Sequence, residues 1–179
     1  NGFVMLFGFS ILSVVIWLPI VFGLTVLIIG NDHRVVLVRW ISLLGSTLGF
    51  IVALPLYTGF DSTLSSMQFV EQHAWFERFN VYYHLGVDGI SMPLILLNCL
   101  ITPLVVIAGW EVIRDRTSQY LGAFLIMSGI VNGVFASLDA VLFYTFWEAS
   151  LIPMFIIIGV WGGPNRVYAA IKFFLYTLL

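Results

Sequence analysis

The stretch LFYTFWEASLIPMFIIIGVWGG, residues 142–163, is almost wholly apolar and aromatic but contains one ionisable acid, Glu148. In a membrane-spanning helix this carboxyl group would lie roughly 13 Å below the surface, near the bilayer centre. A charged side chain at that depth is costly unless it is neutral, paired or hydrated. Desolvation favours the neutral form and a nearby cation favours the charged form, so a neighbouring charge that changes could load and release a proton. The pattern indicates a proton-handling residue; a protonated glutamate hydrogen-bonded to another helix is the structural alternative.

Pro153 lies five residues after Glu148. Because proline has no N–H group, the carbonyl of Ala149 loses its helical partner. Within hydrocarbon such an opening is tolerated only against other protein or a wet cavity. The freed carbonyl adjoins Glu148, where it could hold a water.

Lys172 is the only lysine in the chain, and it lies six residues after Arg166, or about 9 Å into the last apolar segment. Tyr168 and Tyr176 stand four residues to either side and share its helical face. This Tyr-Lys-Tyr stripe could donate and relay protons. The alternative is that the lysine extends its ammonium group to the headgroups.

Other kinds of chemistry lack the residues that they need. The single cysteine, Cys99, cannot form a disulfide within the chain, and no Cys or His spacing indicates a haem, iron–sulfur or metal site. The sequence has no glycine-rich phosphate loop and no basic cluster for nucleic acid. We expect the chain to bind no metal and no cofactor of its own.

The composition is that of a membrane protein, because 61% of the residues are hydrophobic and 9% are charged, against about a quarter charged in soluble domains. About 20 apolar residues cross the bilayer as a helix. We expect an all-α polytopic protein with one transmembrane domain over 1–179. Its helices are predicted at about 6–29, 35–57, 89–110, 118–137, 140–160 and 166–179. Because the chain starts with Asn and ends in an apolar run, it is expected to be an N-terminal fragment with the sixth helix truncated.

The arginines indicate the orientation. They cluster at the first, third and fifth connections: Arg34, Arg39, Arg114, Arg116 and Arg166. By the positive-inside rule, loops 30–34, 111–117 and 161–166 face the cytoplasm and the N-terminus lies outside, in what we expect to be a bacterial inner membrane. Trp40, Trp110 and Trp161 would form an aromatic belt at the inner ends.

The second connection is long and patterned. Runs of roughly alternating residues over 67–75 and 79–85 flank a polar bend, which predicts a β-hairpin on the outer face; an amphipathic loop is the alternative. Asp88 is expected to cap the third helix. Two pairs of polar residues, Asn98 with Thr102 and Ser128 with Asn132, each share a helical face and favour interhelical hydrogen bonding.

Three segments carry a family resemblance: ERFNVYYHLGVDGISMPLILLN, GVFASLDAVLFYTFWEASLIPMFIIIGVWGG and YAAIKFFLYTL. They resemble the antiporter-like chain M of proton-pumping NADH:quinone oxidoreductase, respiratory complex I, whose mitochondrial counterpart is subunit four. The motifs FWEASLIPM and KFFLYT make the match specific. It runs from about Trp75 to the end.

The resemblance implies a fold of about fourteen helices with two inverted five-helix repeats, in a row of related membrane-arm subunits. It implies that Glu148 is the proton-channel acid and that Lys172 belongs to the polar axis. NADH, flavin, iron–sulfur clusters and quinone would be used by other subunits, so this chain would be a non-redox subunit of an oxidoreductase that acts as a translocase. The alternatives are a subunit of an Mrp-type cation/proton antiporter or of a membrane-bound hydrogenase, and a non-catalytic membrane scaffold.

Overall fold

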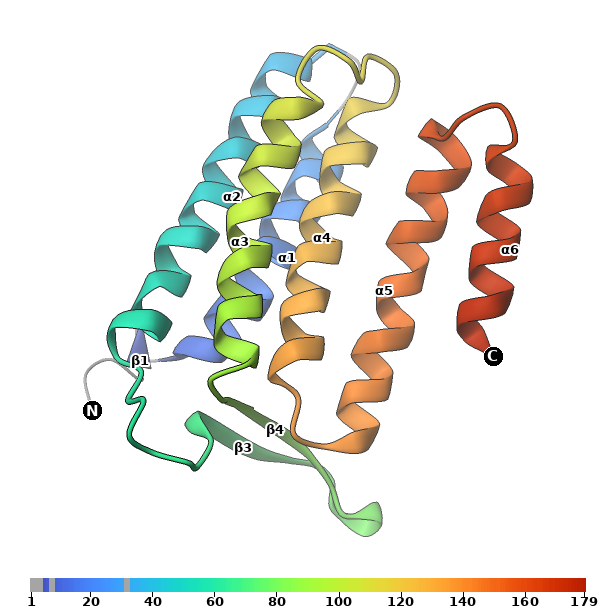
Figure 1. Cartoon of the computed structure of the whole chain (residues 1–179). Coiled ribbons are helices and arrows are strands. Elements are labelled where there is room, and N and C mark those ends of the chain that lie inside the picture. The colour runs from blue at the N-terminus through green and yellow to red at the C-terminus, as the bar shows by residue number, and fades with distance from the viewer. Residues whose placement is uncertain (1–4, 7–8, 31–32) are drawn as a thin grey trace.

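The computed structural model describes residues 5–6, 9–30 and 33–179 (Figure 1). Its helices are α1 (Ile11–Ile29), α2 (Val35–Thr58), α3 (Ser91–Ala108), α4 (Thr117–Ala136), α5 (Ala140–Trp161) and α6 (Arg166–Leu178). Within the described ranges, the five helices α1 to α5 are long and apolar enough to cross a membrane. The predicted all-α membrane fold with an added hairpin is confirmed.

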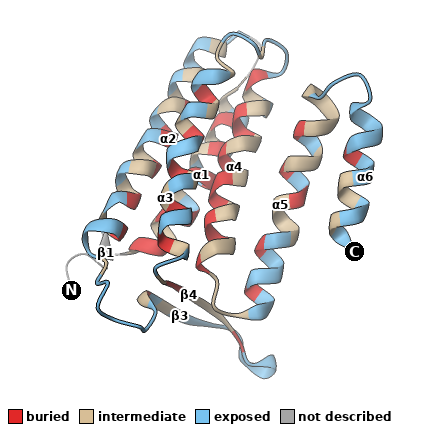
Figure 2. Ribbon diagram, in the orientation of Figure 1, coloured by how far each residue is buried: buried red, intermediate tan, exposed pale blue. Residues whose placement is uncertain are grey.

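The first four helices form a bundle, and α5 and then α6 extend it to one side (Figure 1). Helix α4 packs on α1, α2, α3 and α5, and carries buried residues along its length (Figure 2). Helix α6 packs on α5, where the Phe155 and Phe174 rings meet edge to face at 5.4 Å. The two outer helices therefore keep much of their surface uncovered by this part of the chain.

The start of the first helix differs from the prediction. Helix α1 begins at Ile11 rather than at residue 6, and two short strands, β1 (Met5–Leu6) and β2 (Phe9–Ser10), pair antiparallel before it. The apolar run is longer than a membrane span requires, since the 19 residues of α1 already reach about 28 Å. Hydrophobicity alone therefore did not mark the boundary. Residues 7–8, in the predicted helix, and 31–32, in the first connection, lie outside the described residues.

The predicted hairpin is present. Strand β3 (Gln68–Phe76) pairs antiparallel with β4 (Val81–Val87), and a 3₁₀ turn over Glu77–Phe79 joins them. Asn80 ends the turn in the left-handed conformation with φ 56°, which asparagine tolerates better than most residues. The hairpin lies across the end of the bundle where α1, α3 and α5 begin (Figure 1).

Two aspartates attach the hairpin to the helices. Asp88 accepts hydrogen bonds from the backbone N–H groups of Ile90 and Ser91 at 2.9 and 2.8 Å, which confirms the expected cap of α3. Asp139 accepts from Val141 and Leu142 at the start of α5, and its other oxygen accepts from the N–H of Tyr82 in β4. These hydrogen bonds hold the pKa of each carboxyl group below its ordinary value of 3.8.

Polar side chains inside the bundle connect α1, α3 and α4 near Asn132. The Asn98 amide donates to Asn132 Oδ1 and to the Ser128 carbonyl, both at 2.9 Å, and Thr102 shares a 2.8 Å hydrogen bond with the Ser128 hydroxyl. Asn132 Nδ2 in turn donates to the carbonyl of Val15 at 3.3 Å. The predicted hydrogen bonding between α3 and α4 is confirmed, and it extends to α1.

Helices α1 and α4 approach closely through glycines. A Cβ atom at Gly129 would overlap the carbonyl oxygen of Ile16, and one at Gly23 would lie 2.8 Å from the carbonyl oxygen of Gly122. Membrane helices lack a hydrophobic drive to associate with one another, so such close backbone packing is a principal source of their association.

We expect Gly129→Ala to destabilise the bundle by about 1–3 kcal/mol, because the added methyl group must push α1 away from α4. Gly49→Ala in α2 is the matched control, since its Cβ would meet nothing closer than Pro19 Cγ at 3.7 Å. Thermal unfolding in detergent measures both variants. Equal melting temperatures for the two would contradict this account of the α1–α4 contact.

Replacing Asp139 by alanine should lower the free energy of unfolding by about 1 kcal/mol, because α5 loses its cap and the hairpin loses the hydrogen bond from the Tyr82 N–H. The folded pKa of Asp139 is depressed, so its contribution is complete above 3.8 and is lost as the pH falls through the lower folded value. In melting experiments from pH 6 to pH 3, the difference in melting temperature between wild type and Asp139→Ala should therefore be largest near pH 6. Glu77→Gln, at the exposed turn of the hairpin, is the control and should track wild type. Convergence of the wild-type and Asp139→Ala melting temperatures that begins well above pH 4 would argue against a titrating Asp139.

Candidate functional site

Glu148 lies in the first half of α5, about 12 Å along the helix from its start at Ala140. It is half-buried and borders an open pocket of about 400 Å³ between α5 and the end of α6. The pocket is lined by Phe143, Tyr144, Trp147, Glu148, Thr177, Leu178 and Leu179. The acid therefore lies at mid-span in a mostly aromatic and apolar surrounding.

The neighbouring polar side chains do not pair with Glu148. Thr145 Oγ1 donates to the carbonyl of Val141 at 2.8 Å, and Ser150 Oγ donates to that of Trp147 at 2.6 Å, so both bind their own helix. Within the described part of the chain, Glu148 forms no hydrogen bond and no ion pair. The hydrogen-bonded alternative for this glutamate thus finds no partner among the described helices.

Lys172 lies between the two tyrosines of α6. Its Nζ is 5.8 Å from the ring centroid of Tyr168 and 5.9 Å from that of Tyr176. Both rings are largely exposed, at 68% and 75%, and the stripe lies on a face of α6 that the described chain does not cover. At these distances the ammonium group makes cation–π contacts with the rings.

The structure does not bring the two ionisable groups into contact. Lys172 is not among the residues that line the pocket at Glu148, and no ion pair joins the two within the described ranges. The polar side chain that α6 contributes to this pocket is Thr177, which the sequence did not single out. The roles of Glu148, Lys172, Tyr168 and Tyr176 in proton transfer stay predictions.

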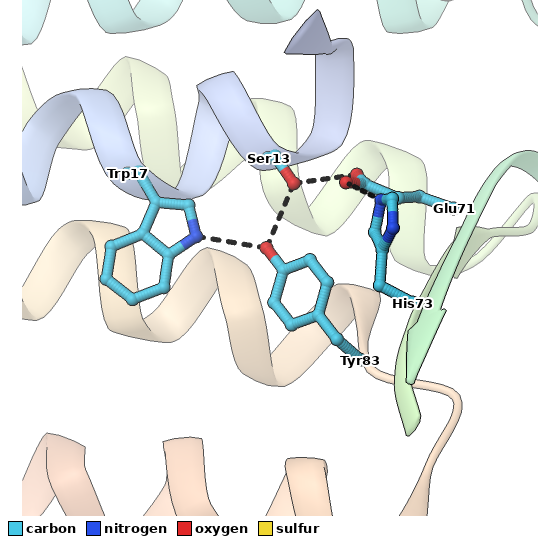
Figure 3. A network of polar contacts seen from close by, with 5 residues as sticks. All are labelled: Ser13, Trp17, Glu71, His73 and Tyr83. Atoms are coloured by element: carbon cyan, nitrogen blue, oxygen red, sulfur yellow. Dashed lines mark hydrogen bonds and ion pairs between the residues drawn. The ribbon is translucent and has the colours of Figure 1, made fainter. Parts of the chain in front are cut away.

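A second polar cluster, which the sequence did not predict, joins the hairpin to α1 (Figure 3). Ser13 Oγ donates to Glu71 Oε2 at 2.7 Å and lies 3.0 Å from the hydroxyl of Tyr83, to which Trp17 Nε1 also donates at 3.0 Å. His73 Nε2 lies 3.2 Å from Glu71 Oε1, and the Glu71 side chain is only 9% exposed. Burial raises the pKa of Tyr83. This cluster fixes the hairpin against the start of α1.

The spacing of these five residues gave no signal, because Ser13 and Tyr83 are 70 positions apart and the contacts form only when the hairpin folds back over α1. The alternation along the strands was the one available sign that Tyr83 points inward. No sequence feature indicated Ser13 or Trp17.

Two family descriptions together match the chain from residue 3 to residue 179. The amino-terminal model of NADH-ubiquinone oxidoreductase chain 4 matches residues 3–136. The chain belongs to this family. Residues 137–179, which include Glu148 and Lys172, match the transmembrane model described as NADH:quinone oxidoreductase/Mrp antiporter. The resemblance found in the FWEASLIPM and KFFLYT motifs is confirmed, and the chain is an integral membrane protein.

Individual relatives agree with the family models. The chain is 42% identical over 173 residues to NADH-quinone oxidoreductase subunit M of Rhodobacter capsulatus, over 95% of this chain and 33% of the relative. It is 43% identical over 169 residues to NADH-ubiquinone oxidoreductase chain 4 of Arabidopsis thaliana, a match that covers 94% of this chain and 34% of the relative. A chain of respiratory complex I from Thermus thermophilus with bound NADH matches the fold with a TM-score of 0.77 and 31% identity, over 93% of this chain and 32% of that chain. The chain spans about a third of the length of these proteins.

Tyr83→Phe should lower stability by about 1 kcal/mol, because it removes the hydroxyl that Ser13 and Trp17 share. Tyr82→Phe is the matched control on the same strand, since the Tyr82 hydroxyl makes no hydrogen bond within the described residues. The rate of protease cleavage at the hairpin reports the effect locally. Similar cleavage of the two variants would show that the cluster does not hold the hairpin.

Proposed function

We propose that this chain belongs to a proton-translocating membrane-arm subunit of an NADH:quinone oxidoreductase, in which Glu148 gains and loses a proton during turnover. The observation that carries the proposal is a carboxyl group at mid-span, beside an open pocket, with no partner among the described residues. An intramembrane acid of this kind is expensive to keep, and such residues commonly mark ion pathways. Family membership supplies the reaction class.

The proposed mechanism depends on two properties of α5. Desolvation at mid-span favours neutral Glu148, and a cation that approaches the pocket favours its charged form, so a cation that moves would drive uptake and release. Pro153 leaves the Ala149 carbonyl without a helical donor, so this carbonyl can bind a water next to the acid. The stripe of Lys172, Tyr168 and Tyr176 is a candidate for the continuation of the path.

In this proposal the redox reaction takes place in other subunits. NADH, flavin, iron–sulfur clusters and quinone would be bound there, and this chain would contribute proton transfer alone. Its partners would be the lipid bilayer and other membrane-arm subunits, including related antiporter-like chains. The arginine-rich connections favour placing the ends of α1, α3 and α5 at the cytoplasmic side of a bacterial inner membrane, with the hairpin outside.

A cation/proton antiporter is the second candidate, because the description matched by residues 137–179 includes Mrp antiporters. The description matched by residues 3–136 names the oxidoreductase and not the antiporter, which favours the first candidate. The two differ in what proton movement is coupled to: electron transfer in the first, and the opposite movement of another cation in the second.

Glu148→Gln in the full-length protein within its complex tests the proposal, because glutamine keeps the shape and cannot bind a proton. We expect NADH-driven quinone reduction and proton pumping in membrane vesicles to fall together by about tenfold or more, with assembly unchanged. Glu77→Gln at the hairpin tip is the matched control and should leave both rates at wild-type levels.

Two outcomes would contradict this function. Wild-type pumping by Glu148→Gln would make the carboxyl group structural, as in a non-catalytic scaffold. Proton movement that follows an imposed sodium gradient but not NADH oxidation would favour the antiporter instead.

A further inference from the structure

A large pocket opens at the end of the bundle away from the hairpin. It has a volume of about 1100 Å³ and lies between the α3–α4 connection and the end of α5. The α3–α4 and α5–α6 connections both lie at this end of the molecule (Figure 1). Its lining comes from four parts of the fold: the start of α2, residues 112–116, the end of α5 and the start of α6. None of its residues takes part in the site at Glu148.

The pocket concentrates positive charge. Arg114, Arg116 and Arg166 line it, and Asp115 is the single carboxylate among the lining residues. The ion pair found within the described ranges joins Glu71 and His73 at the opposite end, so none of the three guanidinium groups forms an ion pair with a described carboxylate. Arg114 uses its Nε to donate to the Glu111 carbonyl at 3.2 Å, which leaves its terminal nitrogens available. A guanidinium fork of this kind fits a phosphate.

The rim of the pocket is held in place by hydrogen bonds. Trp161 Nε1 donates to the Asp115 carbonyl at 2.9 Å and so joins the end of α5 to the α3–α4 connection. The Arg39 guanidinium donates to the Ile113 carbonyl at 3.3 Å from the side of α2. The arginines of the connection are therefore presented by an ordered backbone.

An apolar wall lies beside these charges. Val35, Val112, Val160 and Trp161 line the same pocket. Tryptophan is enriched at the level of the headgroups, and Trp40 and Trp110 pack edge to face at 5.2 Å at this end of the bundle. The pocket thus combines a phosphate-binding charge with an apolar surface at the depth where a phospholipid carries the same two features.

We propose that this pocket binds an acidic phospholipid, with its phosphate between Arg114, Arg116 and Arg166 and its acyl chain along Val160 and Trp161. Three cations against one carboxylate favour a lipid of net negative charge over a zwitterionic one. Basic pockets between membrane helices bind acidic headgroups in this way. The inference does not depend on proton transfer by Glu148.

The test uses the full-length protein in its assembled complex, in vesicles of phosphatidylcholine that contain a phosphatidylglycerol with a photoreactive acyl chain. Cross-linked peptides are mapped by mass spectrometry. We expect labelling of residues 159–161 that excess phosphatidylglycerol abolishes, and that neither excess phosphatidylcholine nor millimolar inorganic phosphate reduces. These competition measurements use the wild-type protein, so they test the proposal even if a substituted protein fails to assemble.

Substitutions test which arginines bind the phosphate. Arg114, Arg116 and Arg166 changed together to glutamine should lower the labelling by about tenfold or more. Arg34→Gln removes a cation from the same end of the bundle but outside this pocket, and should leave the labelling unchanged. Equal labelling of the triple variant and wild type, or equal competition by phosphatidylcholine, would overturn the proposal. If inorganic phosphate reduced the labelling and excess phosphatidylglycerol did not, the arginines would bind a soluble anion, and the proposal of a lipid site would be wrong.

Discussion

The fold depends on how polar groups are satisfied where no water can reach them, and Asn132 is the point at which this constraint is met. Its side chain is fully buried in α4 and bonds to Asn98 in α3 and to the backbone of Val15 in α1. Each of these groups alone in hydrocarbon would be costly, but together they are paired. The glycines of α1 and α4 allow this pairing, because they bring the two backbones close enough for a side-chain amide to reach across.

The same packing separates a closed part of the molecule from an open one. Helices α1 to α4 pack on one another, and the hairpin is joined to α1 through Ser13 and Tyr83 and to the start of α5 through Asp139. Helices α5 and α6 attach to one side and keep many exposed residues (Figure 2). The Lys172 stripe lies on an uncovered face of α6, and half-buried Glu148 lies at the edge of a pocket. The rigid bundle thus positions α5, while the groups that could carry protons remain accessible to whatever packs next.

Much of this arrangement could be predicted from the sequence, since hydrophobic runs, helix-spaced polar pairs and alternating strands are local patterns. Glu148 is conspicuous because nothing around it is charged, and Asp88 because it precedes an apolar run. The cluster of Ser13, Trp17 and Tyr83 could not be predicted, because its members are ordinary residues whose meeting depends on the path of the hairpin. The start of α1 was wrong for a related reason: an apolar run sets how long a helix can be, not where the chain begins it.

The acidic residues of the chain differ in whether they help to hold the fold together. Asp88 and Asp139 lie at helix ends and each accepts several hydrogen bonds, so their charges are used to join elements. Glu148 lies where a charge is most costly, yet within the described residues it joins nothing. A carboxyl group that stabilised the bundle would be expected among the partners of Asn98 and Asn132, where the helices meet. Its place at the edge of a pocket, on a helix that contains Pro153, suits a group whose protonation is to change.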